Sequence, residues 1–285
     1  MDKKTIFKNL VGTAITEFTI PTNVKKIRSR GLANKYYLTN VIFHEKVNSL
    51  GNYAFYYCSS LKTISLPNSI TVIGDHVFTM CYQLENVLSL GSITKLPYGA
   101  FQGCEMLKNI NIPNTVIEVD ASVFYNCDSL VTISLPDGIT NLPSQVFYNC
   151  IGLTSIKLPN NLTQIGTSCF AECTSLKNID IPETVQSIRA SAFNNIGADS
   201  LTIPKNVSSI GEQCFVSDSL TTIRFEQPAG MLIGLPTPGT TTGMFGKKTA
   251  TTKTIYTDNE TIKNYDYSKD NVTATIYHLD GSTWE

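Results

Sequence analysis

Apolar residues recur along this chain every 23 residues. The repeated unit is residues 107–129, LKNINIPNTVIEVDASVFYNCDS, and shifting it by 23 residues places apolar positions on apolar positions. One column consists of Phe55, Phe78, Phe101, Phe124, Phe147, Phe170 and Phe193. A second consists of Cys58, Cys81, Cys104, Cys127, Cys150 and Cys173, and a third of Leu61, Leu84, Leu107, Leu130, Leu153 and Leu176. Columns that share one spacing over six or more copies predict a solenoid built from stacked coils.

Each repeat contains two short apolar segments, which we call the first and the second pulse. The first, at residues 61–66, alternates with period two and predicts a short strand. Proline, which cannot donate to a ladder, follows this pulse at Pro67, Pro113, Pro136, Pro159, Pro182 and Pro204. The second pulse consists of two apolar residues three positions apart, such as Ile70 and Ile73. A small residue, Phe and Cys follow it. We expect one parallel strand per coil, about 4.8 Å from the next, and a helical turn or 3₁₀ segment around each Phe.

The repeat divides the chain into three parts of one elongated domain. Residues 1–14 form an N-terminal flank or cap, and residues 15–252 form a solenoid of about ten coils. The period shortens to 22 after Phe193, and the last coil is enlarged by a Pro-, Gly- and Thr-rich stretch. Residues 253–285 are expected to form a β-α-β cap, with a strand at 254–256, a helix capped by Asp258 or Asn259, and a last strand at 272–278.

The strands also predict a candidate binding surface. Because Ile64 and Leu66 point inward, Thr63 and Ser65 point outward, and the same two columns run through every coil. The predicted surface consists of Asn40, Ile42, Thr63, Ser65, Asn86, Leu88, Asn109, Asn111, Thr132, Ser134, Ser155, Lys157, Asn178, Asp180, Thr222 and Arg224. Ile42 and Leu88 are apolar where solvent is expected. An inert, solvated face is the alternative, and a one-residue shift in the coil at 84–106 would turn Leu88 and Leu90 inward.

Seven of the tyrosines lie early in the chain: Tyr36, Tyr37, Tyr53, Tyr56, Tyr57, Tyr82 and Tyr98. Tyrosine offers a large contact area with few rotatable bonds, which favours recognition surfaces. The alternative is that these rings stack on one another along the convex side and stabilise the coils. The sequence leaves both readings open.

Composition and charge exclude several classes of protein. The chain has 22 basic and 23 acidic residues, so nothing in the overall balance predicts a nucleic-acid or anionic-membrane partner. There is no run of 18 apolar residues, and we expect no membrane insertion. Lys8 interrupts the short apolar start, so we expect no signal peptide here. Either the chain is not exported by that route, or an export signal lies upstream of this sequence.

The cysteines and histidines do not predict a catalytic or metal site. Six cysteines lie in one line about 5 Å or more apart, whereas zinc requires four ligands around one point. We expect buried, reduced thiols that act as small hydrophobes, with Cys169 and Cys214 in the small-residue column. His44, His76 and His278 lie in different coils, there is no glycine-rich phosphate loop, and carboxylates do not recur as a facing pair. We therefore expect no enzyme and no cofactor.

The pattern L-x-x-I-x-L-P-x-x-V-x-x-I-G-x-x-A-F-x-x-C-x-x, over about residues 15–224, resembles the BspA-like leucine-rich repeats. That resemblance implies an α/β repeat fold, a right-handed horseshoe with a parallel sheet on the concave face and short helical or irregular segments on the convex face. It also implies a non-enzymatic, monomeric adhesion-type protein that binds a protein or glycan at a cell surface. The ending resembles the terminal segment of family members found near bacteriophage genes. The alternative function is therefore a structural or receptor-reading component of a phage tail or other surface assembly.

Overall fold

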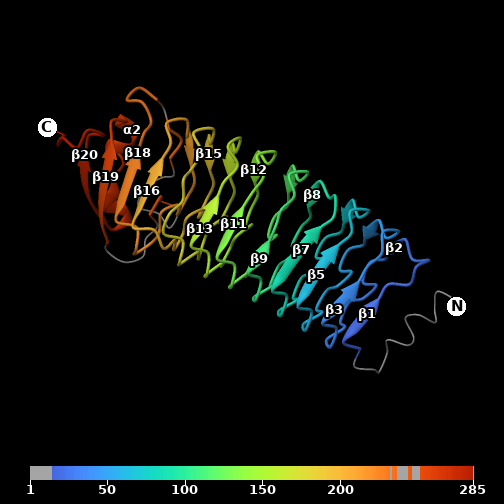
Figure 1. The fold of residues 1–285 in the computed structure, drawn as a ribbon. Coiled ribbons are helices and arrows are strands. Elements are labelled where there is room, and N and C mark those ends of the chain that lie inside the picture. Colours follow the sequence, from blue (N-terminus) through green and yellow to red (C-terminus); the bar gives the residue numbers. More distant parts are fainter. Residues whose placement is uncertain (1–14, 232, 236–242, 246–250, 285) are drawn as a thin grey trace.

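The computed structural model describes residues 15–231, 233–235, 243–245 and 251–284. The predicted flank at residues 1–14 lies outside the described residues. Figure 1 shows coils stacked along one nearly straight, gently twisted axis, with the two ends of the chain at opposite ends of the stack. Most coils are one 23-residue repeat, so a residue at position i lies beside its counterpart at i+23, as Asn86 lies beside Asn109. After Phe193 the spacing is 22, as between Ser200 and Thr222.

The first apolar pulse forms the predicted strand in most coils, whereas in the coil at residues 176–198 it forms only a single bridge. These strands are β1 (Glu17–Thr19), β3 (Asn40–Ile42), β5 (Thr63–Leu66), β7 (Asn86–Leu90), β9 (Asn109–Ile110), β11 (Thr132–Ser134), β13 (Ser155–Lys157), β16 (Ser200–Ile203), β18 (Thr222–Phe225), β19 (Thr251–Thr257) and β20 (Val272–Tyr277). Every recorded strand pair among them is parallel, as the stacking of successive coils requires. The number of paired residues varies along the ladder, and the pairing of β13 with the next coil consists of one bridge between Ser155 and Asn178. We call the outward surface of these strands the strand face.

The second apolar pulse also forms strands, which the sequence did not lead us to expect. They are β2 (Lys26–Ile27), β4 (Ser49–Leu50), β6 (Val72–Ile73), β8 (Lys95–Leu96), β10 (Glu118–Val119), β12 (Asn141–Leu142), β14 (Gln164–Ile165), β15 (Ser187–Ile188) and β17 (Ser209–Ile210). In each strand the first residue faces outward and the second is buried. Two residues are too few to show an alternation in the sequence. We call this set the second strand column.

The prediction of helical turns around each Phe is wrong. Residues two before and two after the Phe have positive φ, as in Tyr53 (φ 59°) and Tyr57 (φ 57°), which no right-handed helix allows. The segment is a series of tight turns whose alternate N–H groups donate to the next coil. Phe55 N donates to Val77 O at 2.9 Å, and Tyr57 N to Thr79 O at 2.8 Å. Between-coil hydrogen bonds therefore run along this side as well, which we call the turn face.

The absence of helices from the described repeat coils at residues 15–225 explains why the stack is not a horseshoe. Packed helices lie 8–10 Å apart, whereas strands lie about 4.8 Å apart, so helices on one side would spread the coils there and bend the axis. On the turn face, successive Phe rings stack with centroids 5.4–5.8 Å apart from Phe55 to Phe193. The distance between successive coils is therefore nearly the same on the strand face and on the turn face. The result is a parallel β-solenoid with almost no helix, and the predicted horseshoe with a helical convex side is not confirmed.

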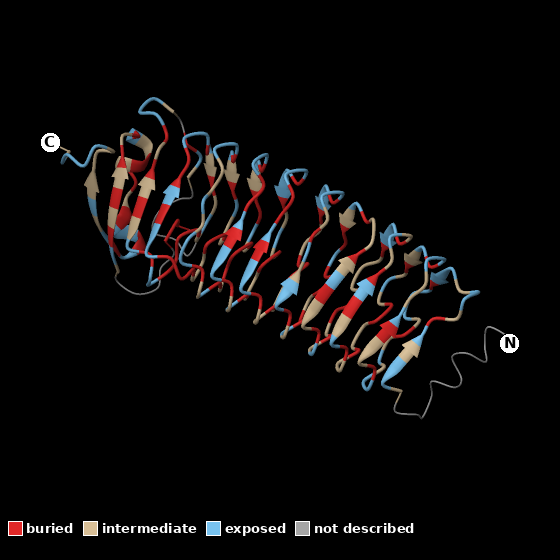
Figure 2. Cartoon of the chain, viewed as in Figure 1, coloured by how far each residue is buried: buried red, intermediate tan, exposed pale blue. Residues whose placement is uncertain are grey.

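The core is a set of continuous columns of side chains. Each Phe from Phe55 to Phe193 is fully buried, and neighbouring rings are within 19° of parallel. The stack ends after Phe193, where the coil shortens to 22 residues. There Phe215 packs edge-on against Phe225, with ring centroids 5.9 Å apart. Figure 2 shows buried segments alternating with exposed ones along the strands.

The cysteine column has a hydrogen-bonding role beside the Phe column. The Cys81 thiol donates to Phe55 O at 3.2 Å, and that carbonyl also accepts the Cys58 N–H at 3.2 Å. The same thiol-to-carbonyl bond joins coils at Cys104, Cys127, Cys150 and Cys173. All eight cysteines are buried and unpaired, as predicted. Burial raises the pKa of Cys58, Cys173 and Cys214 to about 12.

The coil at residues 84–106 contains a bulge that settles the register of its leucines. The β5–β7 pairing shifts after Ile64, so Ser65 faces Ser89 and Leu66 faces Leu90. Leu88 is the extra residue: its side chain points outward and is 65% exposed, while Leu90 is buried. This coil lacks the proline that ends the first pulse in most of the others. Gly91, with φ of +69°, makes the shortened turn that follows, where a Cβ would meet Pro67 O at 2.6 Å.

The C-terminal segment places a short helix between the last two strands. Strand β19 is followed by α2 (Glu260–Lys263) and the 3₁₀ helix η1 (Tyr267–Asp270), and β20 then pairs in parallel with β19. Asn259 caps α2, because its Oδ1 accepts from Thr261 N at 3.0 Å and Ile262 N at 3.3 Å. Its amide nitrogen donates to Pro228 O and Met231 O. One side chain therefore ties the helix to the enlarged coil.

We predict that Phe124→Ala lowers the free energy of unfolding by about 3–5 kcal/mol, because it deletes a fully buried ring from the middle of the stack. Lys157→Ala, at an exposed position on the strand face, is the control and should change it by less than about 0.5 kcal/mol. Denaturant midpoints of the two variants measure the difference. Similar losses in both would contradict the assignment of inward and outward columns.

We also predict that the thiols of the folded protein react slowly with a polar alkylating reagent. At pH 8 a thiol with a pKa of about 12 is thiolate in roughly one molecule in ten thousand, and burial blocks access as well. Mass spectrometry after alkylation of native and unfolded protein measures this. Labelling should require unfolding. Rapid native labelling of Cys104, Cys127 and Cys150, or a mass lower by pairs of hydrogens, is the contradicting result.

Candidate functional site

The structure places all sixteen predicted surface residues on the outer side of the coils. None of them is buried, whereas the residues between them, such as Val41, Ile64 and Val87, are. Asn111, Asn178 and Asp180 lie just outside the assigned strands but keep the same outward positions. The strand face is therefore one continuous surface that runs the length of the stack. Whether it binds a ligand stays a prediction.

Amide side chains on the strand face bond to one another from coil to coil. Asn109 Nδ2 donates to Asn86 Oδ1 at 3.0 Å, and Asn40 Nδ2 donates to Glu17 Oε2 at 3.0 Å. At the edge of this face, Lys108 Nζ lies 3.2 Å from Glu85 Oε2. These bonds hold side chains in fixed positions before any partner arrives. A pre-ordered surface loses less conformational entropy on binding than a mobile one.

Two apolar side chains interrupt this polar surface. Ile42 in β3 is 42% exposed and Leu88 in β7 is 65% exposed. One coil, that of β5, separates them, and two strand spacings amount to roughly 10 Å. The outward pointing of Leu88 follows from the bulge and from the missing proline of its coil. Both residues were predicted from the sequence to be exposed.

The C-terminal part of the strand face differs from the rest. Arg224 donates to Leu279 O at 2.8 Å and lies 3.6 Å from Glu226 Oε1, so its guanidinium already has partners within the chain. The residue remains on the predicted surface, but its contacts anchor the segment after β20. Lys157 and Asp180 are the exposed charges of this half.

The early tyrosines form an aromatic cluster on the turn face. Tyr57 is central: its ring lies 5.2 Å from Tyr36, 6.1 Å from Tyr56 and 5.6 Å from Tyr82. The rings do pack against one another, which was one of the two readings of the sequence. Tyr36, Tyr37 and Tyr98 are nevertheless exposed. Packing therefore accounts for part of the cluster and leaves ring surface open to solvent.

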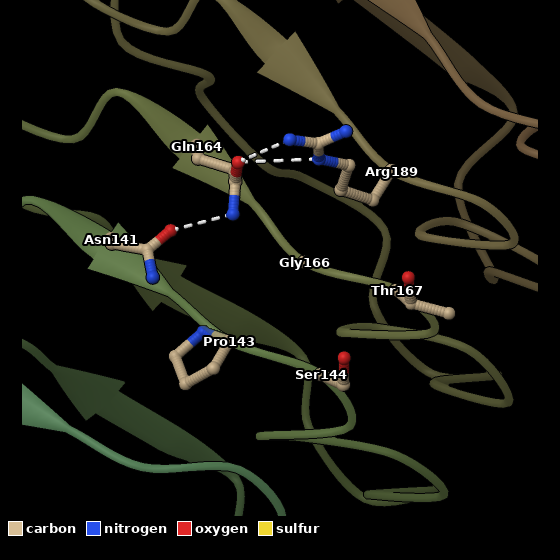
Figure 3. A pocket seen from close by; sticks show the side chains of 7 residues that line it. All are labelled: Asn141, Pro143, Ser144, Gln164, Gly166, Thr167 and Arg189. Atoms are coloured by element: carbon tan, nitrogen blue, oxygen red, sulfur yellow. Dashed lines mark hydrogen bonds between the residues drawn. The ribbon is translucent and has the colours of Figure 1, made fainter.

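A shallow polar depression lies beside the second strand column. Figure 3 shows Gln164 between Asn141 and Arg189: its amide nitrogen donates to Asn141 Oδ1 at 2.9 Å, and its oxygen accepts from Arg189 Nη2 at 3.0 Å. The depression has a volume of about 350 Å³ and is completed by Pro143, Ser144, Gly166 and Thr167. No sequence motif marks this depression, so it could not be predicted from the sequence. It holds no paired nucleophile and base, so it gives no support to catalysis.

The histidines are separate and each has a local partner. His44 Nε2 donates to Pro21 O, and His278 Nδ1 lies 2.9 Å from Asp258 Oδ1. The Thr79 hydroxyl gives its proton to Gly99 O, so the His76 Nδ1 beside it is the protonated nitrogen. Burial lowers the pKa of His76 despite the nearby Asp75 carboxylate. None of these contacts builds an acid–base pair for catalysis.

Metal and membrane sites are not found in the part of the chain that the structure describes. Within it, no three His, Cys, Asp or Glu side chains come together as metal ligands would. Among the same residues, no helix is both long enough and apolar enough to cross a bilayer.

The chain is similar to known repeat proteins in sequence and in fold. Residues 3–130 and 94–222 match six copies of the BspA type leucine rich repeat region. The crystal structure of the T. pallidum leucine-rich repeat protein is similar with a TM-score of 0.54 and 24% identity, over 58% of this chain and 80% of that one. The pneumococcal vaccine antigen PcpA is similar with a TM-score of 0.55 and 18% identity, over 95% of this chain and 79% of that one.

No curated protein sequence matches the chain. At these identities the two structures show a shared fold and nothing of a shared ligand. The repeat match is stronger evidence, because it spans well over half of the sequence and rests on the Leu, Phe and Cys columns seen in the core. The chain belongs to the BspA-type leucine-rich repeat family.

Proposed function

We propose that this chain is a non-enzymatic binding protein that recognises a protein or a glycan through its strand face. The observation that carries the proposal is the strand face itself, a regular array of small polar side chains with Ile42 and Leu88 exposed among them. Repeat proteins bind partners on such extended surfaces. A surface or adhesion role fits the family, and the partner would lie on another cell or particle.

The arrangement suits recognition for two physical reasons. The Asn ladder supplies fixed donors and acceptors, so hydrogen bonds to a partner cost little ordering of side chains. Ile42 and Leu88 supply apolar area, which is worth about 25 cal/mol for each Å² that a partner covers. Polar groups set the orientation, and the two apolar residues act as anchors. Both anchors lie in the N-terminal half of the stack.

The site is expected to centre on Ile42, Thr63, Ser65 and Asn86. These residues lie on the neighbouring strands β3, β5 and β7, and no backbone segment among the described residues covers them in Figure 1. The charged half is the alternative location, and Lys157 tests it better than Arg224. The Arg224 guanidinium bonds to Leu279 O, so removing it would disturb the C-terminal segment as well as the face.

Binding to a glycan array and to a panel of extracellular-matrix proteins tests the proposal. We predict that Ile42→Asp weakens binding of any ligand found by about tenfold or more, with little change in stability, because it puts a charge at an apolar anchor. Val72→Asp is the matched control: Val72 is 58% exposed but lies in the second strand column. It should leave the affinity within about twofold.

Two outcomes would contradict the proposal. One is an absence of any ligand in both screens. The other is an equal effect of Ile42→Asp and Val72→Asp, which would show that binding does not use the strand face. Full affinity in Ile42→Asp together with loss in Lys157→Ala would keep the strand face but move the site to its charged half.

A further inference from the structure

The near-zero net charge of the chain conceals an uneven distribution. Residues 15–60, the first two coils, contain six Lys or Arg (Lys25, Lys26, Arg28, Arg30, Lys35, Lys46) and two acidic residues (Glu17, Glu45). Residues 61–285 contain 13 basic and 20 acidic residues. The first two coils therefore form a basic end on an otherwise acidic rod. A local excess of one sign of charge attracts partners of the opposite sign even when the total is balanced.

Four of these cations lie close together around β2. Lys25, Lys26, Arg28 and Arg30 are all exposed, and the residue at their centre, Ile27, is buried and fixes the segment to the core. None of the ion pairs between described residues involves any of the four. Within the part of the chain that the structure describes, these four charges therefore have no ion-pair partner. In the column of Ser29 and Asn52, the first acidic residue is Asp75, two coils on.

A line of aromatic rings begins at this basic segment and runs along the axis of the stack. The Arg30 guanidinium lies 4.9 Å above the Tyr53 ring, Tyr53 stacks on His76 at 4.8 Å, and His76 meets Tyr98 edge-on at 5.0 Å. Arg30, Tyr53 and His76 occupy the same position in three successive coils, and Tyr98 directly precedes Gly99, the equivalent position in the fourth. Tyr98, at the end of the line, is 43% exposed. Cations and open aromatic surface therefore share one edge of the molecule.

We propose that the basic-aromatic surface formed by Lys25, Lys26, Arg28, Arg30, Tyr53 and Tyr98 binds an anionic polysaccharide. Sulfate or carboxylate groups on such a chain pair with the lysines and bind the arginine forks in bidentate fashion. The apolar faces of sugar rings pack on tyrosine, which offers a large, rigid contact area. This surface lies beside the second strand column, apart from the strand face. It is a second binding surface beyond the proposed function.

The charge pattern favours a flexible glycan over nucleic acid. The four cations lie in the first coil, and the surface reaches Tyr98 over three strand spacings, about 15 Å along the axis. Duplex DNA carries one charge per about 1.7 Å and is stiff over far longer distances, so it would extend over the acidic coils that follow. Beyond Tyr98, the following residues include Glu105, Glu118 and Asp120. A flexible polysaccharide can place a few anionic groups on the patch and bend away.

Fluorescence anisotropy with a labelled short heparin oligosaccharide as the probe tests this inference. The wild-type protein should bind it at about 0.05 M salt and lose affinity as the salt rises. The double variant Lys26→Ser/Arg28→Ser should bind about tenfold more weakly. Lys62→Ser/Lys157→Ser removes two exposed cations from the strand side and gives the same net charge, and it should bind like wild type. Tyr98→Ser should weaken binding with the charge unchanged.

Four results would overturn the inference. They are no binding to heparin at low salt, equal loss in the two double variants, unchanged binding in Tyr98→Ser, and tighter binding of a single-stranded DNA of equal charge than of heparin. Ile42→Asp separates this inference from the proposed function, because it should leave heparin binding unchanged. Loss of heparin binding in Ile42→Asp with retention in Lys26→Ser/Arg28→Ser would place the glycan on the strand face and refute the second surface.

Discussion

Backbone hydrogen bonds between coils, repeated at one spacing on every side, are the constraint on which this structure depends. The strand ladders require about 4.8 Å between coils. The turn face meets the same requirement because residues such as Tyr53 adopt positive φ and turn alternate N–H groups toward the next coil. A positive φ costs about 1–2 kcal/mol in a residue with a side chain, and the between-coil bonds and Phe stacking offset that cost. The core columns fill the space that these ladders enclose.

This constraint also decides where function can lie. The depression beside Gln164 in the described coils is shallow and polar. Chemistry that requires several groups around one point is difficult to build when each coil presents its side chains in lines. Lines of side chains instead suit recognition of extended partners. The strand face offers an ordered polar array with two anchors, and the edge of the first coils offers cations beside aromatic rings.

The sequence predicted the repeat, the strands of the first pulse and the buried Phe and Cys columns, because each depends on a period that many copies reinforce. It did not predict the second strand column or the turn face. A two-residue strand such as Val72–Ile73 shows no alternation, and positive φ is usually marked by Gly or Asn, whereas here Tyr53 and His76 adopt it. The register at Leu88 depended on a bulge that only the pairing of β5 with β7 reveals.

The sequence predicted the strand face but not the basic end of the chain or the contacts of Arg224. Outward positions follow directly from strand alternation, so all sixteen strand-face residues lie where they were expected. The basic end was missed because the total charge of −1 averages over opposite local excesses. The role of Arg224 depends on Leu279, which is 55 residues away in the chain, and no local pattern encodes such a contact.

Removal of one whole coil tests the central claim most directly. Deleting residues 107–129 joins Met106 to Leu130 and leaves every downstream column facing its counterpart, so this variant should be soluble and melt cooperatively with somewhat lower stability. Deleting only residues 107–115 removes β9 from one coil and leaves neighbouring ladder groups unpaired and a gap in the core, so this variant should lose cooperative melting. Thermal melts of the two proteins, followed by circular dichroism, give the comparison. Cooperative melting of the nine-residue deletion alone would contradict the account.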